Sequence, residues 1–303
     1  MGTQKLTSTY WPKVFMEKII EKIIHSAQIK EAHASHAPII KSVFLKLRKI
    51  FLELDIEQGE GRREKGEGIS YTIQRIQIRT LLNTLTKLLE AIITLLDGKN
   101  YESIDPLARV AMEHSVNVIY LNRGKKNERS KQLLKHYIET TLEKSDFWYK
   151  FAQKHCNDVA ADIALKKINF LKELKVGHSG LYDRSIGKWP SPFKRFEECG
   201  YEAEYVTLYA MNSDSVHSLS EDAYNYCTVS NYPDELQEHV IRNYRALSLS
   251  MSVYLSIKSV YFYGLTINSI CQLLKSNHDI SNIVNELHDI TLEHEEENFQ
   301  RWS

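Results

Sequence analysis

Apolar residues recur every three to four positions over most of the chain, which is the period of a helix with one buried face. No stretch longer than a few residues alternates between apolar and polar positions as a strand does. Glycine and proline are scarce, 12 and 6 in 303 residues, and they gather between the periodic segments. The pattern therefore predicts an all-α fold, a single domain of about nine to eleven helices. The predicted helices are residues 12–28, 37–54, 71–96, 105–122, 127–155, 158–175, 201–218, 233–264, 267–275 and 280–300.

The segment 105–122 is apolar or small on nearly every side, and Asp105-Pro106 at its start is typical of a helix N-terminus. A helix that is apolar all round is usually central, so we expect this one to be buried. Arg109, Glu113 and Asn117 nevertheless follow one another at intervals of four. They place one polar stripe along the helix.

Three segments interrupt or end the helical pattern. Residues 55–69 combine four glycines with dense charge, which indicates a mobile loop, because a phosphate-binding loop would need Gly-Lys-Ser/Thr after a strand. Residues 176–200 hold the highest density of glycine and proline and predict an internal connector within one domain, with a short helix at 191–198. Residues 278–303 predict a C-terminal amphipathic helix that docks on the core or on another chain.

Composition narrows the classes of function. The 39 basic and 39 acidic residues cancel, so only a local patch could attract nucleic acid. Four separated cysteines without a Cys-x-x-Cys pair, no signal-like N-terminus and no run of about 18 apolar residues favour a cytoplasmic protein without a membrane contact. His25, His33 and His36 beside Glu31 could suggest a metal, but the spacing is irregular and favours surface positions. We expect no metal and no cofactor.

A second polar stripe lies on the predicted helix 201–218. Tyr205, Tyr209, Ser213 and His217 are spaced by four throughout and therefore share one face. The ordinary interpretation is a half-exposed helix whose polar tips reach water. The alternative is that this stripe faces the one at Arg109, Glu113 and Asn117.

The surroundings of Arg109 and Glu113 favour that alternative. The two could neutralise each other within their helix, but the flanking positions are apolar, and a buried ion pair needs further hydrogen-bond partners. Ser213 and His217 are candidates, because a guanidinium offers five donors and a carboxylate accepts from an imidazolium. We therefore predict a polar site that is shared between the two helices.

Arg-x-x-x-Glu followed about 100 residues later by Tyr-x-x-x-Ser-x-x-x-His resembles a helical bacterial family of unknown function found in defence and mobile-element loci. The resemblance covers roughly residues 70–260, and that family in turn resembles the HEPN superfamily. HEPN ribonucleases carry an arginine, four to six residues and a histidine, usually contributed by both protomers of a dimer. Arg109 with His114 and Arg129 with His136 match that pattern literally. In the first pair, a helical rotation of about 140° between the two residues would make their side chains diverge.

The resemblance implies a metal-independent endoribonuclease that acts as a toxin or effector in anti-phage defence or a toxin–antitoxin system. Its expected partners are RNA or a nucleotide, together with a second copy of the chain or a larger defence complex. The competing hypothesis is a non-catalytic scaffold or sensor subunit of such a complex, and a third is nucleotide recognition. The expected residues are catalytic Arg109, Glu113 and His217, substrate-binding Tyr209, Ser213 and Asn117, and the secondary candidates His114, Arg129 and His136.

Overall fold

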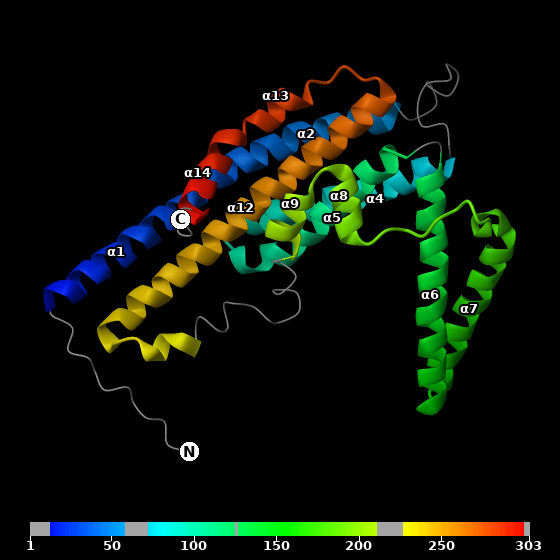
Figure 1. Ribbon diagram of the computed structural model, residues 1–303, viewed down its shortest axis with the longest axis horizontal. Helices are drawn as coiled ribbons and strands as arrows, with labels where there is room; N and C mark the ends of the chain where they lie inside the picture. The colour runs from blue at the N-terminus through cyan, green and yellow to red at the C-terminus, as the bar shows by residue number, and fades with distance from the viewer. Residues whose placement is uncertain (1–12, 58–71, 125–126, 211–226, 300–303) are drawn as a thin grey trace.

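The computed structural model describes residues 13–57, 72–124, 127–210 and 227–299, and every element within these ranges is a helix or a turn (Figure 1). The all-α prediction is therefore confirmed. The first helices are α1 (Lys13–Ala32), α2 (Ala37–Glu57), α4 (Thr72–Asp97), α5 (Ile104–Asn122), α6 (Glu128–Lys154) and α7 (Asp158–Gly177). They are followed by α8 (Pro192–Cys199), α9 (Glu202–Glu204), α12 (Asp234–Leu274), α13 (Ile280–Asn285) and α14 (His288–Phe299).

The helix α12 extends along most of the bundle, and α1, α2, α4 and α5 pack along it (Figure 1). It has 41 residues, which corresponds to about 60 Å at 1.5 Å per residue. The predicted break between 264 and 267 is wrong, because the helix continues through Gly264. A Cβ atom at this position would collide with Val284 of α13, so the glycine allows α13 to pack closely.

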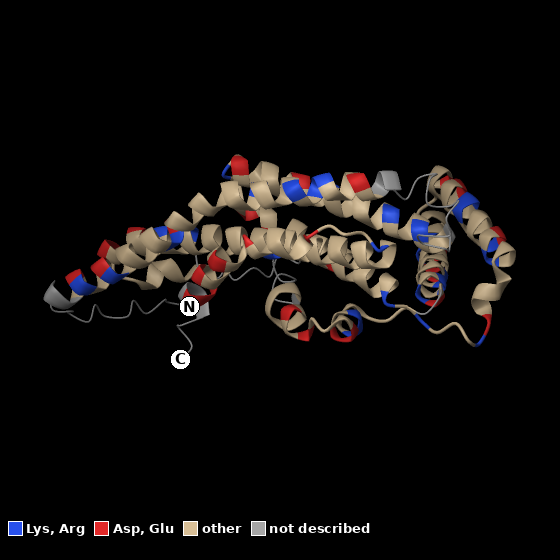
Figure 2. Ribbon diagram, turned by 90° about the horizontal axis from the view of Figure 1, so that it is seen from above, with Lys and Arg blue, Asp and Glu red and all other residues tan. Residues whose placement is uncertain are grey.

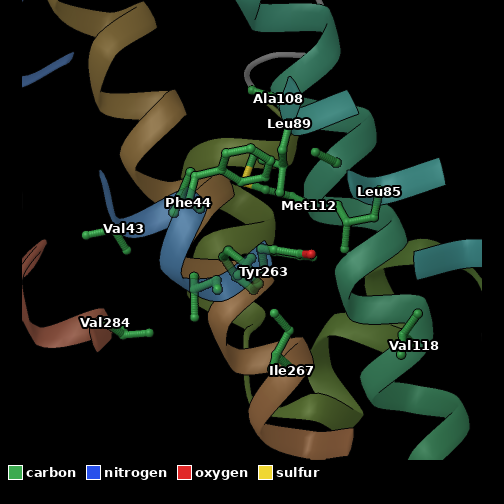
Figure 3. Close-up of a cluster of buried hydrophobic side chains, with 14 of the residues drawn as sticks. Val43, Phe44, Leu85, Leu89, Ala108, Met112, Val118, Tyr263, Ile267 and Val284 are labelled. Atoms are coloured by element: carbon green, nitrogen blue, oxygen red, sulfur yellow. The ribbon is translucent and has the colours of Figure 1, made fainter. Parts of the chain in front are cut away.

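The prediction that residues 105–122 form a buried central helix is confirmed. Helix α5 contacts both α4 and α12, and Ala108, Met112 and Val116 are fully buried. Figure 3 shows Ala108 and Met112 in the same cluster as Phe44 of α2, Leu85 of α4 and Tyr263 of α12. The hydroxyl of Tyr263 lies 3.0 Å from Oγ1 of Thr86, so the polar end of this buried ring is hydrogen-bonded.

The histidines His33 and His36 are buried, which corrects their prediction as surface residues. The short 3₁₀ helix η1 (His33–His36) turns the chain from α1 into α2 against α12 and α14. His33 Nδ1 lies 2.8 Å from Ser250 Oγ, and His36 Nδ1 lies 3.1 Å from Nε2 of the fully buried His294. Contacts with distant segments bury these imidazoles, which local spacing could not reveal.

The C-terminal segment forms two helices rather than the single amphipathic helix predicted for 278–303. A turn at residues 286–287 separates α13 from α14, and buried Leu287 and Ile290 hold this part against the bundle. None of the described helices combines the length and apolar composition that crossing a membrane requires. Acidic and basic residues alternate along the ribbons of the outer helices in Figure 2.

The helices α6 and α7 form an antiparallel hairpin that projects away from the bundle (Figure 1). The seam between them buries mostly small or aliphatic residues, namely Ile138, Ser145, Ala152, Ala164, Ile168 and Leu171. The connector 176–200 then returns to the bundle through the 3₁₀ helix η3 (Ser179–Tyr182) and α8. Of the glycine-rich segment 55–69, residues 55–57 end α2 and the rest lie outside the described residues.

Candidate functional site

Glu113, in the middle of α5, receives hydrogen bonds from two segments that are distant in sequence. Arg195 of α8 donates from Nη2 to Oε1 at 2.8 Å, and Tyr209 donates from Oη to Oε2 at 2.8 Å. Each carboxylate oxygen therefore has its own partner. The charge of Glu113 is shared across helices, as we predicted, but the cation that pairs with it is Arg195 rather than Arg109.

The start of helix α8 places Arg195 in the interior. Ser191 caps the helix by accepting a hydrogen bond from the Lys194 amide at 3.4 Å, and Pro192 occupies the first turn. One turn later Arg195 is only 4% exposed and donates from Nη1 to the Pro190 carbonyl at 2.6 Å. Burial lowers the pKa of the Arg195 guanidinium, and Glu113 opposes that shift. An arginine pKa starts far above neutral, so the side chain remains charged.

Arg195 was not among the residues expected from sequence. It lies in the connector 176–200, where the predicted short helix 191–198 agrees with α8 but carried no functional assignment. A signal was present: Arg195, Phe196 and Cys199 share the buried side of this helix. An arginine on the apolar face of a short helix indicates a buried anionic partner.

The segment after α9 is a π-helix, η4 (Tyr205–Ala210), instead of the start of an α-helix. The described part of the predicted helix 201–218 is thus helical, but from Tyr205 it has π rather than α geometry, and residues 211–218 lie outside the described residues. The rings of Tyr205 and Tyr209 stack with centroids 5.1 Å apart, and both contact Phe196 of α8 at 5.4 Å. This aromatic packing directs the Tyr209 hydroxyl towards α5.

Tyr209 links the carboxylate to a second arginine. Its hydroxyl accepts a hydrogen bond from Nη2 of Arg109 at 3.2 Å, and the guanidinium carbon lies 4.6 Å from the ring centroid. Burial first, and then the hydrogen bond to Glu113, raise the pKa of Tyr209 to about 12. The phenol is therefore protonated at neutral pH and can donate to Glu113 while it accepts from Arg109.

Several buried polar atoms in and beside this cluster have no hydrogen-bond partner among the described residues. They are Arg109 Nε, Arg195 Nε and Asn117 Oδ1. Leaving such an atom unpaired costs about 1–3 kcal/mol, so a ligand or water that reaches one of them would be stabilised. Within the described residues the cluster contains two guanidinium groups and one carboxylate, so an anion is the ligand that its charge favours.

One expected catalytic residue, His217, and one expected substrate-binding residue, Ser213, lie outside the described residues. Ser213 and His217 follow Tyr209 within the segment 211–226, and the structure places neither of them. Asn117 lies on α5 one turn after Glu113 and is half-buried. Arg109, Glu113 and Tyr209 are thus the expected site residues that the structure brings into one hydrogen-bonded group.

The literal arginine–histidine pairs make contacts with different partners. His114 donates from Nδ1 to the Val110 carbonyl of its own helix at 2.9 Å, whereas Arg109 binds Tyr209. Arg129 donates to the Tyr120 carbonyl at 2.6 Å and pairs with Glu198 at 3.1 Å.

The partner histidine of the second pair is His136, which is exposed, with Nδ1 3.4 Å from Thr140 Oγ1. Neither arginine thus makes a hydrogen bond to the histidine of its motif. Across the described part of the chain, no three His, Cys, Asp or Glu residues are arranged to hold a metal ion.

Comparison with known proteins identifies one family. The model of a family of unknown function, DUF5677, matches residues 76–235, which include α5, α8 and η4. No curated protein and no solved structure matches the chain. The matched range includes every residue of the Glu113 cluster.

Proposed function

The chain belongs to this family of unknown function, DUF5677, and we propose that it is a HEPN-like, metal-independent endoribonuclease with its site at the Glu113 cluster. One observation carries the proposal: Arg109 and Arg195 approach a single carboxylate and a single phenol, which leaves surplus positive charge in a half-buried position. A phosphodiester is an anion of matching geometry, because a guanidinium can bind two of its oxygens at once.

The proposed reaction transfers the phosphoryl group within the RNA strand. The 2′-oxygen attacks the adjacent phosphorus, the P–O5′ bond breaks, and the products are a 2′,3′-cyclic phosphate and a 5′-hydroxyl. A base removes the 2′-proton, an acid protonates the leaving 5′-oxygen, and a cation stabilises the charge on the phosphorane. The released and accepted protons balance, so the reaction needs no other reactant.

The residues divide these tasks by their chemistry. Arg109, whose Nε has no partner among the described residues, is the cation assigned to the phosphate. Glu113 and Tyr209 orient it through the shared phenol. We assign proton transfer to His217, because imidazole titrates near neutral pH, and substrate contacts to Ser213 and Asn117. Arg195 acts as a positioning residue that fixes the Glu113 carboxylate.

A second function is favoured by a specific observation. Arg195 is almost fully buried and donates hydrogen bonds to the Pro190 carbonyl and the Glu113 carboxylate. A purely structural connection between α8 and α5 would make the same contacts. In that case the protein is a non-catalytic scaffold or sensor subunit of a defence complex. Breaking the network would then reduce stability without changing any RNA-directed activity.

The test is cleavage of a short labelled RNA in chelator, with the same strand carrying 2′-deoxy sugars as the negative control. We expect wild type to leave 2′,3′-cyclic phosphate ends and Arg109→Ala or His217→Ala to lose activity by about 100-fold or more. Arg242→Ala is the matched control, because Arg242 is an exposed arginine on α12 that pairs with Glu31. Its activity should remain unchanged.

Thermal unfolding of the same variants separates the two functions. A wild type that leaves RNA intact, together with site variants that only lose stability, would support the scaffold and refute the ribonuclease. The proposed biological role, a cytoplasmic toxin or effector of a defence system, adds that expression should arrest growth. Arg109→Ala should relieve that arrest.

A further inference from the structure

The end of the α6–α7 hairpin exposes an unusual concentration of large apolar side chains. Their exposed fractions range from 38% for Trp148 to 73% for Val159. The rings of Phe147 and Phe151 lie 6.5 Å apart, and the Phe151 ring contacts the His155 ring at 4.4 Å. We use "tip patch" for the set Phe147, Trp148, Phe151, Val159 and Ile163.

The tip patch lies on one side of the hairpin. Successive residues are about 100° apart around a helix axis. The tip-patch residues of α6 therefore span about 100° around its axis, and those of α7 span about 40°. On both helices these residues are rotated in the same sense away from the buried seam. Because the two helices are antiparallel, the same sense of rotation leads to the same face. Tyr137 and Phe170, both exposed, extend this face towards the bundle.

The opposite face of the hairpin is occupied by the returning connector. Lys135 donates to the Ile186 carbonyl at 3.1 Å, and the Tyr182 ring lies 5.7 Å from the Lys135 ammonium and 4.8 Å from that of Lys175. Within the described residues, no hydrogen bond or ring contact joins the connector to the tip patch. Among the described residues, the connector thus covers one face of the hairpin, and the more apolar face is left uncovered.

We propose that the tip patch is the interface through which two copies of this chain pair, so that their hairpins form a four-helix bundle. A whole aromatic side chain has an area of about 150–250 Å². Multiplying such whole-side-chain areas by the exposed fractions gives roughly 550 Å² of exposed area for the five side chains together. A standard interface buries about 800 Å² per partner, of which somewhat over half is apolar. The patch therefore supplies the apolar area that a stable dimer needs.

The charges indicate how the two hairpins lie. Lys144 and Lys167 are exposed on the same face at mid-height, between the tip patch and Tyr137, and the tip patch itself has no charged member. If the hairpins overlap at their tips and point in opposite directions, each Lys144 sits about 9 Å from the two-fold axis along the helix. The two Lys144 ammonium groups are then about 18 Å apart, beyond the screening length of about 8 Å in physiological salt.

The aliphatic residues of the tip patch favour a second copy of the chain over a nucleic acid as the binding partner. Val159 and Ile163 offer neither a ring for base stacking nor a hydrogen bond, whereas close packing between helices uses such side chains. The interface is independent of the Glu113 site and does not rest on the proposed ribonuclease activity. Its test accordingly measures assembly alone.

Sedimentation velocity of the full chain, in reductant because Cys156 is exposed, tests the proposal. We expect wild type to be a dimer at about 50 µM, and Val159→Lys to raise the dissociation constant at least about tenfold. Val176→Lys is the matched control: Val176 is 77% exposed against 73% for Val159, lies on the same helix and points to the opposite face. That variant should dimerise within about twofold of wild type.

Both lysines replace exposed side chains, and circular dichroism checks that the variants are folded. A wild type that stays monomeric up to about 100 µM, about twice the concentration at which we expect the dimer, would overturn the proposal. Equal weakening by Val159→Lys and Val176→Lys would also overturn it. A monomer whose tip-patch variants lose binding to a single-stranded RNA would assign the patch to nucleic acid instead.

Discussion

Arg195 donates a 2.8 Å hydrogen bond to Glu113 across 82 residues of sequence, although Arg109 stands one helical turn from the same carboxylate. Arg109 is instead directed to Tyr209, whose hydroxyl joins it to Glu113. The carboxylate thereby fixes α8 and η4 against α5. Arg195 makes this connection directly, whereas Arg109 reaches the carboxylate only through the phenol.

We expect Arg195→Ala to lower the free energy of unfolding by about 2 kcal/mol. Removing one partner of a fully buried pair costs about 3–5 kcal/mol, and the Glu113 side chain is 30% exposed, so water partly compensates. Urea unfolding at neutral pH measures the change. Lys194→Ala is the control on the same helix, because Lys194 pairs with Glu197 at the surface and its loss should lower stability clearly less than Arg195→Ala does. Equal losses would contradict the structural role of Arg195.

The buried histidines predict loss of stability in acid. Burial first, and then the neighbouring histidines, lower the pKa of His294 to about 3, and burial also lowers the pKa of His33. In the unfolded chain a histidine pKa is about 6.5, so the folded state resists protonation. Stability is complete above pH 6.5 and falls as the pH decreases towards 3. At pH 5 the loss from His294 is about 2 kcal/mol.

Urea unfolding from pH 7.5 to pH 5 in His294→Asn checks that expectation. The groups facing the cluster are Lys30 and the His36–Glu293 pair, whose Nε2 and Oε2 atoms lie 3.3 Å apart. A charge on His294 would have no carboxylate partner in the described contacts. The variant should show a flatter pH dependence than wild type. His136→Asn, at an exposed histidine, should retain the wild-type slope.

Gly264 gives a test of the packing between α12 and α13. Helix propensity alone would make Gly264→Ala stabilising by about 1 kcal/mol. The new Cβ would collide with Val284 of α13, however, and overpacking typically costs about 1–3 kcal/mol. We therefore expect a net loss in urea unfolding, and Val284→Ala in the same chain should recover part of it. If Gly264→Ala is instead more stable than wild type, α13 can shift away from the new Cβ atom without a loss in the free energy of unfolding, and the prediction is wrong.

Hydrophobic periodicity alone predicted the helical class, the segments that became α1 to α8, and the central position of α5. These properties are local: each helix shows which face is apolar within a few turns of its own sequence. Periodicity gave wrong helix ends or helix types where packing against a neighbouring element decides the local conformation. Gly264 lies inside α12 rather than at its end, and its lack of a side chain lets α13 pack closely. Segment η4 is a π-helix, and its Tyr205 and Tyr209 pack on Phe196.

The sequence by itself determined that Glu113 lies on a buried helix and must share its charge with another segment, because an unpaired buried carboxylate is too costly. Only the tertiary structure decided which cation does so. Arg109 and Arg195 are equally charged, and the choice between them depends on the direction in which α8 meets α5. The same holds for His33 and His36, whose burial is caused by α12 and α14, more than 200 residues further along the chain.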